Sequence, residues 1–186
     1  MKKTLFLTLI FSNLIFSQNI DFEGFMNFSY SNNSGEIHLE VNNLDKEFLY
    51  INSLSRGIGN NDIGLDRGQL GNTRIVFFTK RGNKILMVQP NTRYVSNSDN
   101  YLENKAVEEA FARSVLFSFE IIEEKNNNYI IDLTPLLMND AHGVSQRLRF
   151  SNSGNYSLNK SMSAIELGRT KAFPKNIEFD VILTFT

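Results

Sequence analysis

The chain has 186 residues, no cysteine and a formal net charge of −1, from 19 basic and 20 acidic residues. The lack of cysteine excludes disulfides, thiolate catalysis and thiolate zinc sites. Charges of both signs are interspersed along the sequence, without the basic patches by which proteins bind nucleic acid, so we expect no nucleic-acid partner.

The N-terminus has the pattern of a secretory signal peptide over residues 1–17. Lys2 and Lys3 precede an apolar stretch at 5–16, and the small residue Ser17 suits the position before the cleavage site. The stretch is shorter than the roughly 20 residues that span a bilayer. We therefore expect cleavage after Ser17, export to the periplasm or the exterior, and no stable membrane span afterwards, with an uncleaved anchor as the alternative.

The mature part, residues 18–186, is long enough to form one domain with its own core. Removal of the two lysines gives it a formal net charge of −3. Residues 36–41, EIHLEV, alternate strictly between apolar and polar and predict a half-buried strand. Residues 47–54, EFLYINSL, are apolar on both faces and predict a more buried strand, joined to the first by a hairpin.

A glycine-rich segment follows at 57–71, GIGNNDIGLDRGQLG, with five of the eleven glycines of the chain. Glycine permits positive φ and close approach of another group, so the segment is either a tight turn or a binding loop. Its spacing matches neither a dinucleotide fingerprint nor a P-loop, and no phosphate site is expected. Asp66 and Arg67 predict an internal salt bridge that holds the loop, with contact to a ligand or a neighbouring domain as the alternative.

Two hairpins and a helix are predicted in the central part of the chain. The hairpins pair 74–80 with 83–89 and 117–124 with 126–133. Between them, apolar residues at helical spacing predict a helix over about 102–116, capped by Asn100 and packed on the sheet.

The last third contains a turn and a strand. Thr134 and Pro135 predict a short helical turn, with Thr134 as its N-cap. Asp140, His142 and Gly143 predict a turn in which the aspartate hydrogen-bonds its own backbone; a ligand or metal contact is the alternative. Alternating residues from 177 to 185 predict one final strand.

No catalytic or metal-binding motif is present in the sequence. The two histidines do not form an H-E-x-x-H arrangement, and no hydroxyl nucleophile has a recognisable base beside it. We therefore expect no enzymatic activity and no cofactor in this chain alone. The candidate residues for contact with another domain or a ligand are Gly57, Gly59, Asp62, Gly64, Asp66, Arg67, Gly68, Asp140 and His142.

Several stretches together resemble the uncharacterised N-terminal domain of large secreted zinc-dependent metalloproteases of Gram-negative bacteria. The most specific pieces are GLDRGQL at 64–70, DLTPLL at 132–137, DAHGV at 140–144 and AFP-x-N-x-E at 172–178. In that family a later domain carries the zinc on a metzincin-like H-E-x-x-H-x-x-G-x-x-H motif. No residue of that motif occurs here, so the resemblance transfers no catalytic or metal role to any position.

The resemblance implies a non-catalytic module of an exported metallopeptidase, truncated before the catalytic domain, which would be its partner and would hold the zinc. The alternative is a stand-alone periplasmic domain that binds a ligand or a metal. For either function the expected fold is mainly β (α+β), with antiparallel hairpins in a curled sheet or sandwich and one packed helix near 102–116.

Overall fold

The structure is a computed structural model that describes residues 19–186; the signal peptide predicted at 1–17 lies outside the described residues. The strands are β1 (Ile20–Phe22), β2 (Phe28–Tyr30), β3 (Ile37–Val41), β4 (Phe48–Tyr50), β5 (Arg74–Arg81), β6 (Lys84–Gln89), β7 (Ser114–Lys125), β8 (Asn128–Asp132), β9 (Leu158–Ile165), β10 (Lys171–Phe173), β11 (Asn176–Glu178) and β12 (Val181–Phe185). The helices are the 3₁₀ turn η1 (Asn61–Ile63), α1 (Tyr101–Ala110), α2 (Thr134–Leu137) and α3 (Val144–Phe150).

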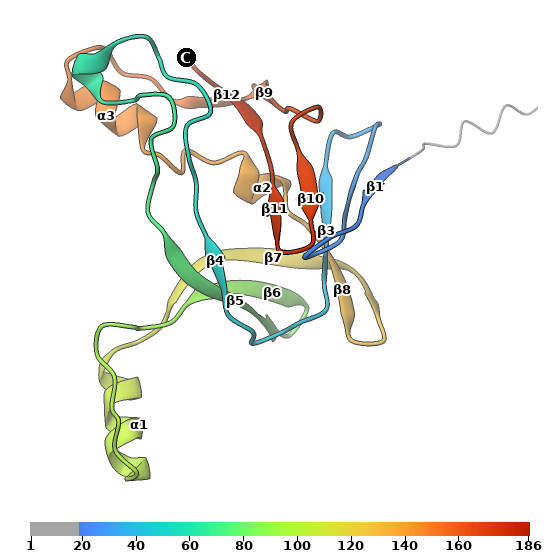
Figure 1. Cartoon of the computed structure of the whole chain (residues 1–186), viewed down its shortest axis with the longest axis vertical. Coiled ribbons are helices and arrows are strands. Elements are labelled where there is room, and N and C mark those ends of the chain that lie inside the picture. The colour runs from blue at the N-terminus through green and yellow to red at the C-terminus, as the bar shows by residue number, and fades with distance from the viewer. Residues whose placement is uncertain (1–18) are drawn as a thin grey trace, which may run out of the picture.

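Eight strands form one curled antiparallel sheet in the order β1-β2-β3-β8-β7-β6-β5-β4, which confirms the mainly β prediction (Figure 1). The concave face carries the core, since the side chains of alternate residues point to it. The most buried members of this core are Phe28, Ile37, Leu39, Val41, Val76, Phe78, Ile85, Met87, Phe119, Tyr129, Ile131 and Leu133.

The two central hairpins are confirmed, as β5–β6 and β7–β8. The hairpin predicted between 36–41 and 47–54 is wrong. β3 pairs instead with β2 and β8, and β4 pairs with β5 at the far edge of the sheet. Local alternation indicates that a strand exists but does not determine its partner, because partners are chosen by packing across the whole sheet.

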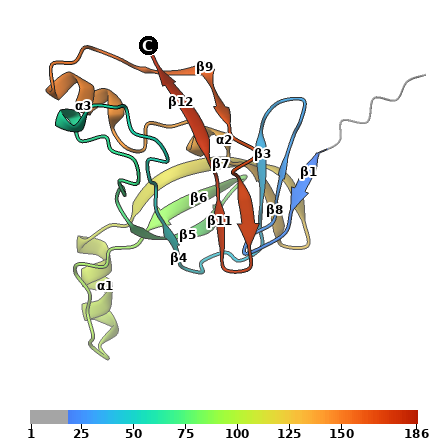
Figure 2. The ribbon, with the colours of Figure 1, turned by 45° about the horizontal axis from the view of Figure 1, so that its top comes forward.

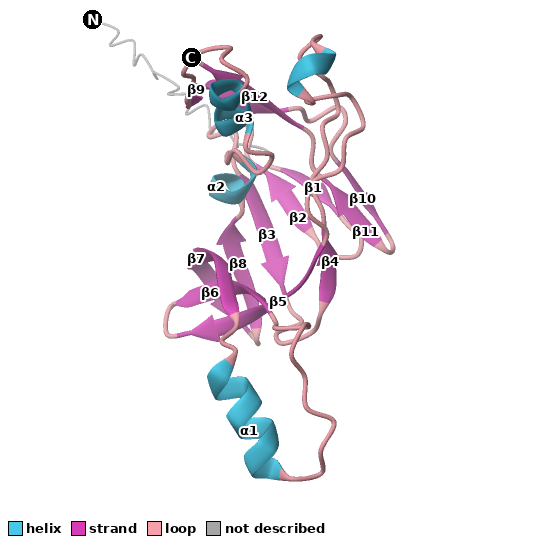
Figure 3. Cartoon of the chain, turned by 90° about the vertical axis from the view of Figure 1, so that its left-hand side faces the viewer, coloured by secondary structure: helices cyan, strands magenta, loops and turns pink. Residues whose placement is uncertain are grey.

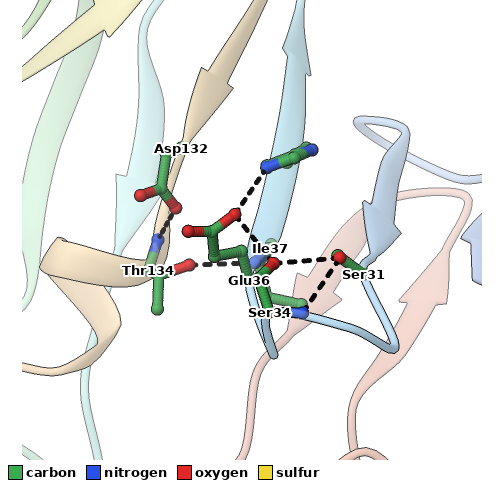
Figure 4. Close-up of polar contacts among 7 residues, drawn as sticks. Ser31, Ser34, Glu36, Ile37, Asp132 and Thr134 are labelled. Carbon is green, nitrogen blue, oxygen red and sulfur yellow. Dashed lines mark hydrogen bonds and ion pairs between the residues drawn. The ribbon is translucent and has the colours of Figure 1, made fainter. Parts of the chain in front are cut away.

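The β3–β8 junction is fixed by side-chain hydrogen bonds at the start of α2 (Figure 4). Asp132 Oδ1 accepts from the backbone N–H of Thr134 at 2.9 Å, and Thr134 Oγ1 accepts from the N–H of Ile37 at 2.9 Å. The N–H of Leu133 also donates to the Ile37 carbonyl at 2.8 Å. Thr134 is thus the first residue of α2 rather than its predicted cap, and its hydroxyl ties β3 to the end of β8.

The β10–β11 hairpin covers the open side of the curled sheet (Figure 2). Ala172, Ile177 and Phe179 pack against the core, and the N–H of Phe25 donates to the carbonyl of Phe173 at 2.8 Å. Close approach is possible there because the neighbouring residue is Gly24. A Cβ at Gly24 would lie 2.7 Å from the Phe173 oxygen.

The final strand predicted at 177–185 is two strands, β11 and β12. The chain leaves β11 so that Phe179 reaches the core, where its ring lies 4.8 Å from that of Phe28. Asp180 then donates its N–H to Thr170 Oγ1 at 3.2 Å and accepts from the N–H of Glu166 at 2.8 Å. These bonds turn the chain into a separate two-stranded ribbon, β9–β12.

The predicted helix at 102–116 is shorter and does not pack on the sheet. α1 ends at Ala110, buries no residue, and extends away from the sheet (Figure 3). Asn100 caps it as predicted, with Oδ1 accepting from the N–H of Leu102 at 2.9 Å. Val115 belongs to β7 because it pairs with Val88 of β6, and this sheet pairing outweighs helical spacing.

We predict that replacing Gly24 with alanine weakens closure of the sheet by the β10–β11 hairpin. The added Cβ would collide with a backbone oxygen, and overpacking of this kind costs about 1–3 kcal/mol of unfolding free energy. Gly168 provides a matched control, since a Cβ there would come no closer than 3.6 Å to another atom. Urea unfolding of the two variants tests this; equal stabilities would contradict the close packing at Gly24.

Candidate functional site

The glycine-rich loop continues the β4–β5 hairpin beyond the sheet and ends beside α3 (Figure 1). Its two arms are joined by backbone hydrogen bonds: Leu54 N–H to Gln69 O at 3.0 Å, Gly68 N–H to Leu54 O at 2.7 Å, and Gly71 N–H to Asn52 O at 2.7 Å. The loop is therefore an ordered, irregular hairpin extension.

Packing of the loop on itself explains its glycines. A Cβ at Gly57 would lie 3.0 Å from both the Leu65 carbonyl oxygen and the Arg67 nitrogen, so the two arms meet only because that position lacks a side chain. Gly64 and Gly68 have φ values of +68° and +81°, in the left-handed region that glycine adopts freely. The tight-turn interpretation accounts for all three positions without a ligand.

The charged residues of the loop point outward. Asp62, Asp66 and Arg67 are exposed. The salt bridge predicted between Asp66 and Arg67 is wrong, since no ion pair joins them within the described residues. The turn is held instead by the backbone, where the N–H of Gln69 donates to the Asp66 carbonyl at 3.1 Å.

Asp140 caps α3 and confirms the predicted aspartate turn. Its Oδ1 accepts from the N–H of Val144 at 2.7 Å, and its Oδ2 accepts from the N–H of Ser145 at 3.0 Å. Gly143 supplies the left-handed residue just before the helix, with φ of +67°. Both carboxylate oxygens are thus used by backbone amides that the first turn of a helix leaves without partners.

His142 lies between the capped helix and the glycine-rich loop. Asn52 Nδ2 donates to its Nδ1, which places the proton of the neutral ring on Nε2. Nε2 is buried and makes no hydrogen bond of proper geometry with the described residues. Burial lowers the pKa of His142, and the charge of Arg147 lowers it further; the Gln69 carbonyl and Asp140 oppose this shift.

Two further side-chain contacts hold the loop in place, and an ion pair supports the second of them. Arg147 Nη1 donates to the Gly64 carbonyl at 2.6 Å, from α3 to the loop. Ser55 Oγ donates to Asp180 Oδ1 at 3.0 Å, and Arg169 Nε contacts Asp180 Oδ2 at 2.8 Å. The two candidate segments, 57–71 and 140–142, therefore do come together, through residues that the sequence did not single out.

The glycine-rich loop, the Asp140 turn and α3 are joined by these contacts into one ordered surface. Within residues 19–186, no group of three or more histidine, aspartate or glutamate side chains is placed to hold a metal ion. In the same part of the chain, no helix has the length and apolar character needed to cross a membrane.

We predict that His142 makes the stability of the protein depend on pH. Because its folded-state pKa lies below the ordinary 6.5, the unfolded chain binds the proton more readily, and this contribution to stability is lost as the pH falls below that value. His142→Asn should flatten the fall in unfolding free energy between about pH 7.5 and pH 5.5. A profile of His142→Asn equal to that of the wild type would contradict this role of His142.

Comparison with known proteins gives one match. Among curated proteins and among solved structures, none matches the chain. The model of the family described as domain of unknown function DUF5117 matches residues 68–186, which include everything from the end of the glycine-rich loop to β12 and leave out β1 to β4. Since the match covers well over half of the sequence, the chain belongs to the DUF5117 family.

Proposed function

We propose that this protein is the non-catalytic N-terminal module of an exported zinc-dependent metallopeptidase, and that it docks on the catalytic domain of that enzyme. The zinc and the catalytic residues would belong to the partner domain. The proposal rests on the sequence resemblance described above and on one structural observation, an exposed aliphatic row beside the glycine-rich loop.

The aliphatic row consists of Leu49, Ile51, Leu70 and Ile75, which are 70%, 46%, 65% and 39% exposed. Leu49 is the direct cross-strand partner of Ile75, and Leu70 is opposite Ser53, two positions beyond Ile51. Alternation along the strands therefore places all four side chains on the convex face, away from the core. Clustered exposed aliphatic side chains of this kind mark protein–protein contact surfaces.

The support beneath this row is held by side-chain hydrogen bonds, which favours binding without reorganisation. The loop that carries Leu70 is fixed by Arg147 on one side and by the contact of Ser55 with Asp180 on the other. β4 is also an edge strand of the sheet formed by the described residues, so its outer backbone can pair with a strand of another domain. A surface that is already ordered loses less conformational entropy on binding.

The alternative, a stand-alone periplasmic domain that binds a small ligand or a metal through the glycine-rich loop and the Asp140 and His142 turn, has less support. Both oxygens of Asp140 accept backbone hydrogen bonds, and His142 Nδ1 accepts from Asn52. A metal or ligand at this turn would have to share Asp140 with these amides, and the ring nitrogen of His142 without a hydrogen bond in the described residues, Nε2, is buried. The side chains of the aliphatic row, in contrast, are exposed.

We predict that Leu49→Asp/Leu70→Asp weakens binding to the catalytic domain by at least about tenfold, because the charges oppose burial of the row. The measurement is titration calorimetry of the purified mature module with the H-E-x-x-H domain encoded in the same or a neighbouring reading frame. Hydrogen exchange should show protection gained in residues 57–71 when the partner is present.

The matched control is Ile122→Asp/Met162→Asp, which alters two side chains of similar exposure, 54% and 60%, on other strands. This control should bind like the wild type. Absence of any complex would refute the proposed function, and equal binding by both double variants would refute the aliphatic row as its docking surface.

A further inference from the structure

A cleft of about 470 Å³ lies between the convex face of the sheet and the projecting segment 90–113, which includes α1. Its lining contains apolar side chains from both sides. Phe77 of β5 contributes from the sheet, and Tyr94 and Phe111 contribute from the segment as a stacked pair with ring centroids 4.1 Å apart. The stack joins the two ends of segment 90–113, so the apolar wall of the cleft has a defined shape.

The charged residues that line the cleft are mostly acidic. Asp45, Glu47 and Glu108 carry negative charge, and Arg113 is the single lining cation. Arg113 is already paired with Glu108 at 2.6 Å and lies over the ring of Phe77 at 5.8 Å. Within the described residues, no cation forms an ion pair with Asp45 or Glu47. The cleft therefore presents two uncompensated carboxylates next to an apolar surface.

The position of these carboxylates is set by the backbone. The N–H of Asp45 donates to the carbonyl of Phe78 at 2.7 Å, which holds the segment before β4 against β5. Glu47 lies two residues before Leu49, and Phe77 lies two residues after Ile75. Because side chains alternate along a strand, the side chains of Glu47 and Phe77 lie on the same convex face as those of Leu49 and Ile75. The cleft is therefore a continuation of the aliphatic row.

We infer that the cleft binds an extended segment of the partner domain in which a lysine or arginine stands beside an aliphatic or aromatic residue. The cation would reach Asp45 and Glu47, and the apolar side chain would pack against Phe77, Tyr94 and Phe111. The inference rests on the proposed function, since it names the chemistry of the partner that docks along this face. Complementary charge next to an apolar contact gives specificity for one segment over others of similar hydrophobicity.

The test measures fluorescence anisotropy of a short labelled peptide of alternating lysine and leucine, compared with the same peptide carrying glutamate in place of lysine. The lysine peptide should bind the mature protein and the glutamate peptide should not. Asp45→Asn/Glu47→Gln should weaken binding about tenfold, because it removes both uncompensated charges and keeps the side-chain shapes. Asp21→Asn/Glu23→Gln removes the same charge from exposed residues at β1 that do not line the cleft, and it should leave binding unchanged.

Equal binding of the two peptides, or an equal loss in both double variants, would overturn the inference, since binding would then depend only on hydrophobicity or on net charge. Titration of Asp45→Asn/Glu47→Gln with the catalytic domain separates the two proposals. A complex that forms normally with this variant would refute the cleft and retain the docking function, whereas the absence of any complex with the wild type would refute the docking function itself.

Discussion

The pairing of β3 with β8 is the contact on which the rest of the fold depends. It joins strands from the two halves of the chain, and three of its residues, Ile37, Leu39 and Ile131, are at most 1% exposed. The Thr134 hydroxyl sets the register, because its bond to Ile37 can form only when the strands are aligned as observed. A shift by one residue would turn the core side chains of β3 outward. Without this pair, β1 and β2 would have no sheet to extend.

Local patterns predicted the elements whose partners are near in sequence. The β5–β6 and β7–β8 hairpins follow from apolar runs around short turns, and the Asp140 turn follows from residues within five positions of one another. The β3–β8 pair, the break at Asp180 and the sheet pairing of Val115 depend on distant segments, so no local period encodes them. The sequence pattern did not predict α3, because the side chain that caps the helix, Asp140, lies four residues before the first helical residue, Val144.

The candidate site likewise has features that nearby residues predict and features that depend on distant segments. The sequence identified the glycine-rich loop and the turn at His142 as special, and they do lie together. It could not identify Asn52, Gln69 or Arg147, since each acts across the gap between two segments that are far apart in the chain. The glycines at 57, 64 and 68 serve the internal packing and turns of the loop, and the aliphatic row on the outward face of the β4–β5 hairpin remains exposed.

The long separation between β3 and β8 also has a consequence for the order in which the chain folds. Ile37 and Thr134 are 97 positions apart, so β1, β2 and β3, which pair with one another, cannot join the other five strands of the main sheet until most of the chain has been synthesised. Such non-local pairing is slow, because a large loop must close before any contact forms. The core is therefore complete only after β8 has been synthesised, so closure of the main sheet is a late, non-local step in folding.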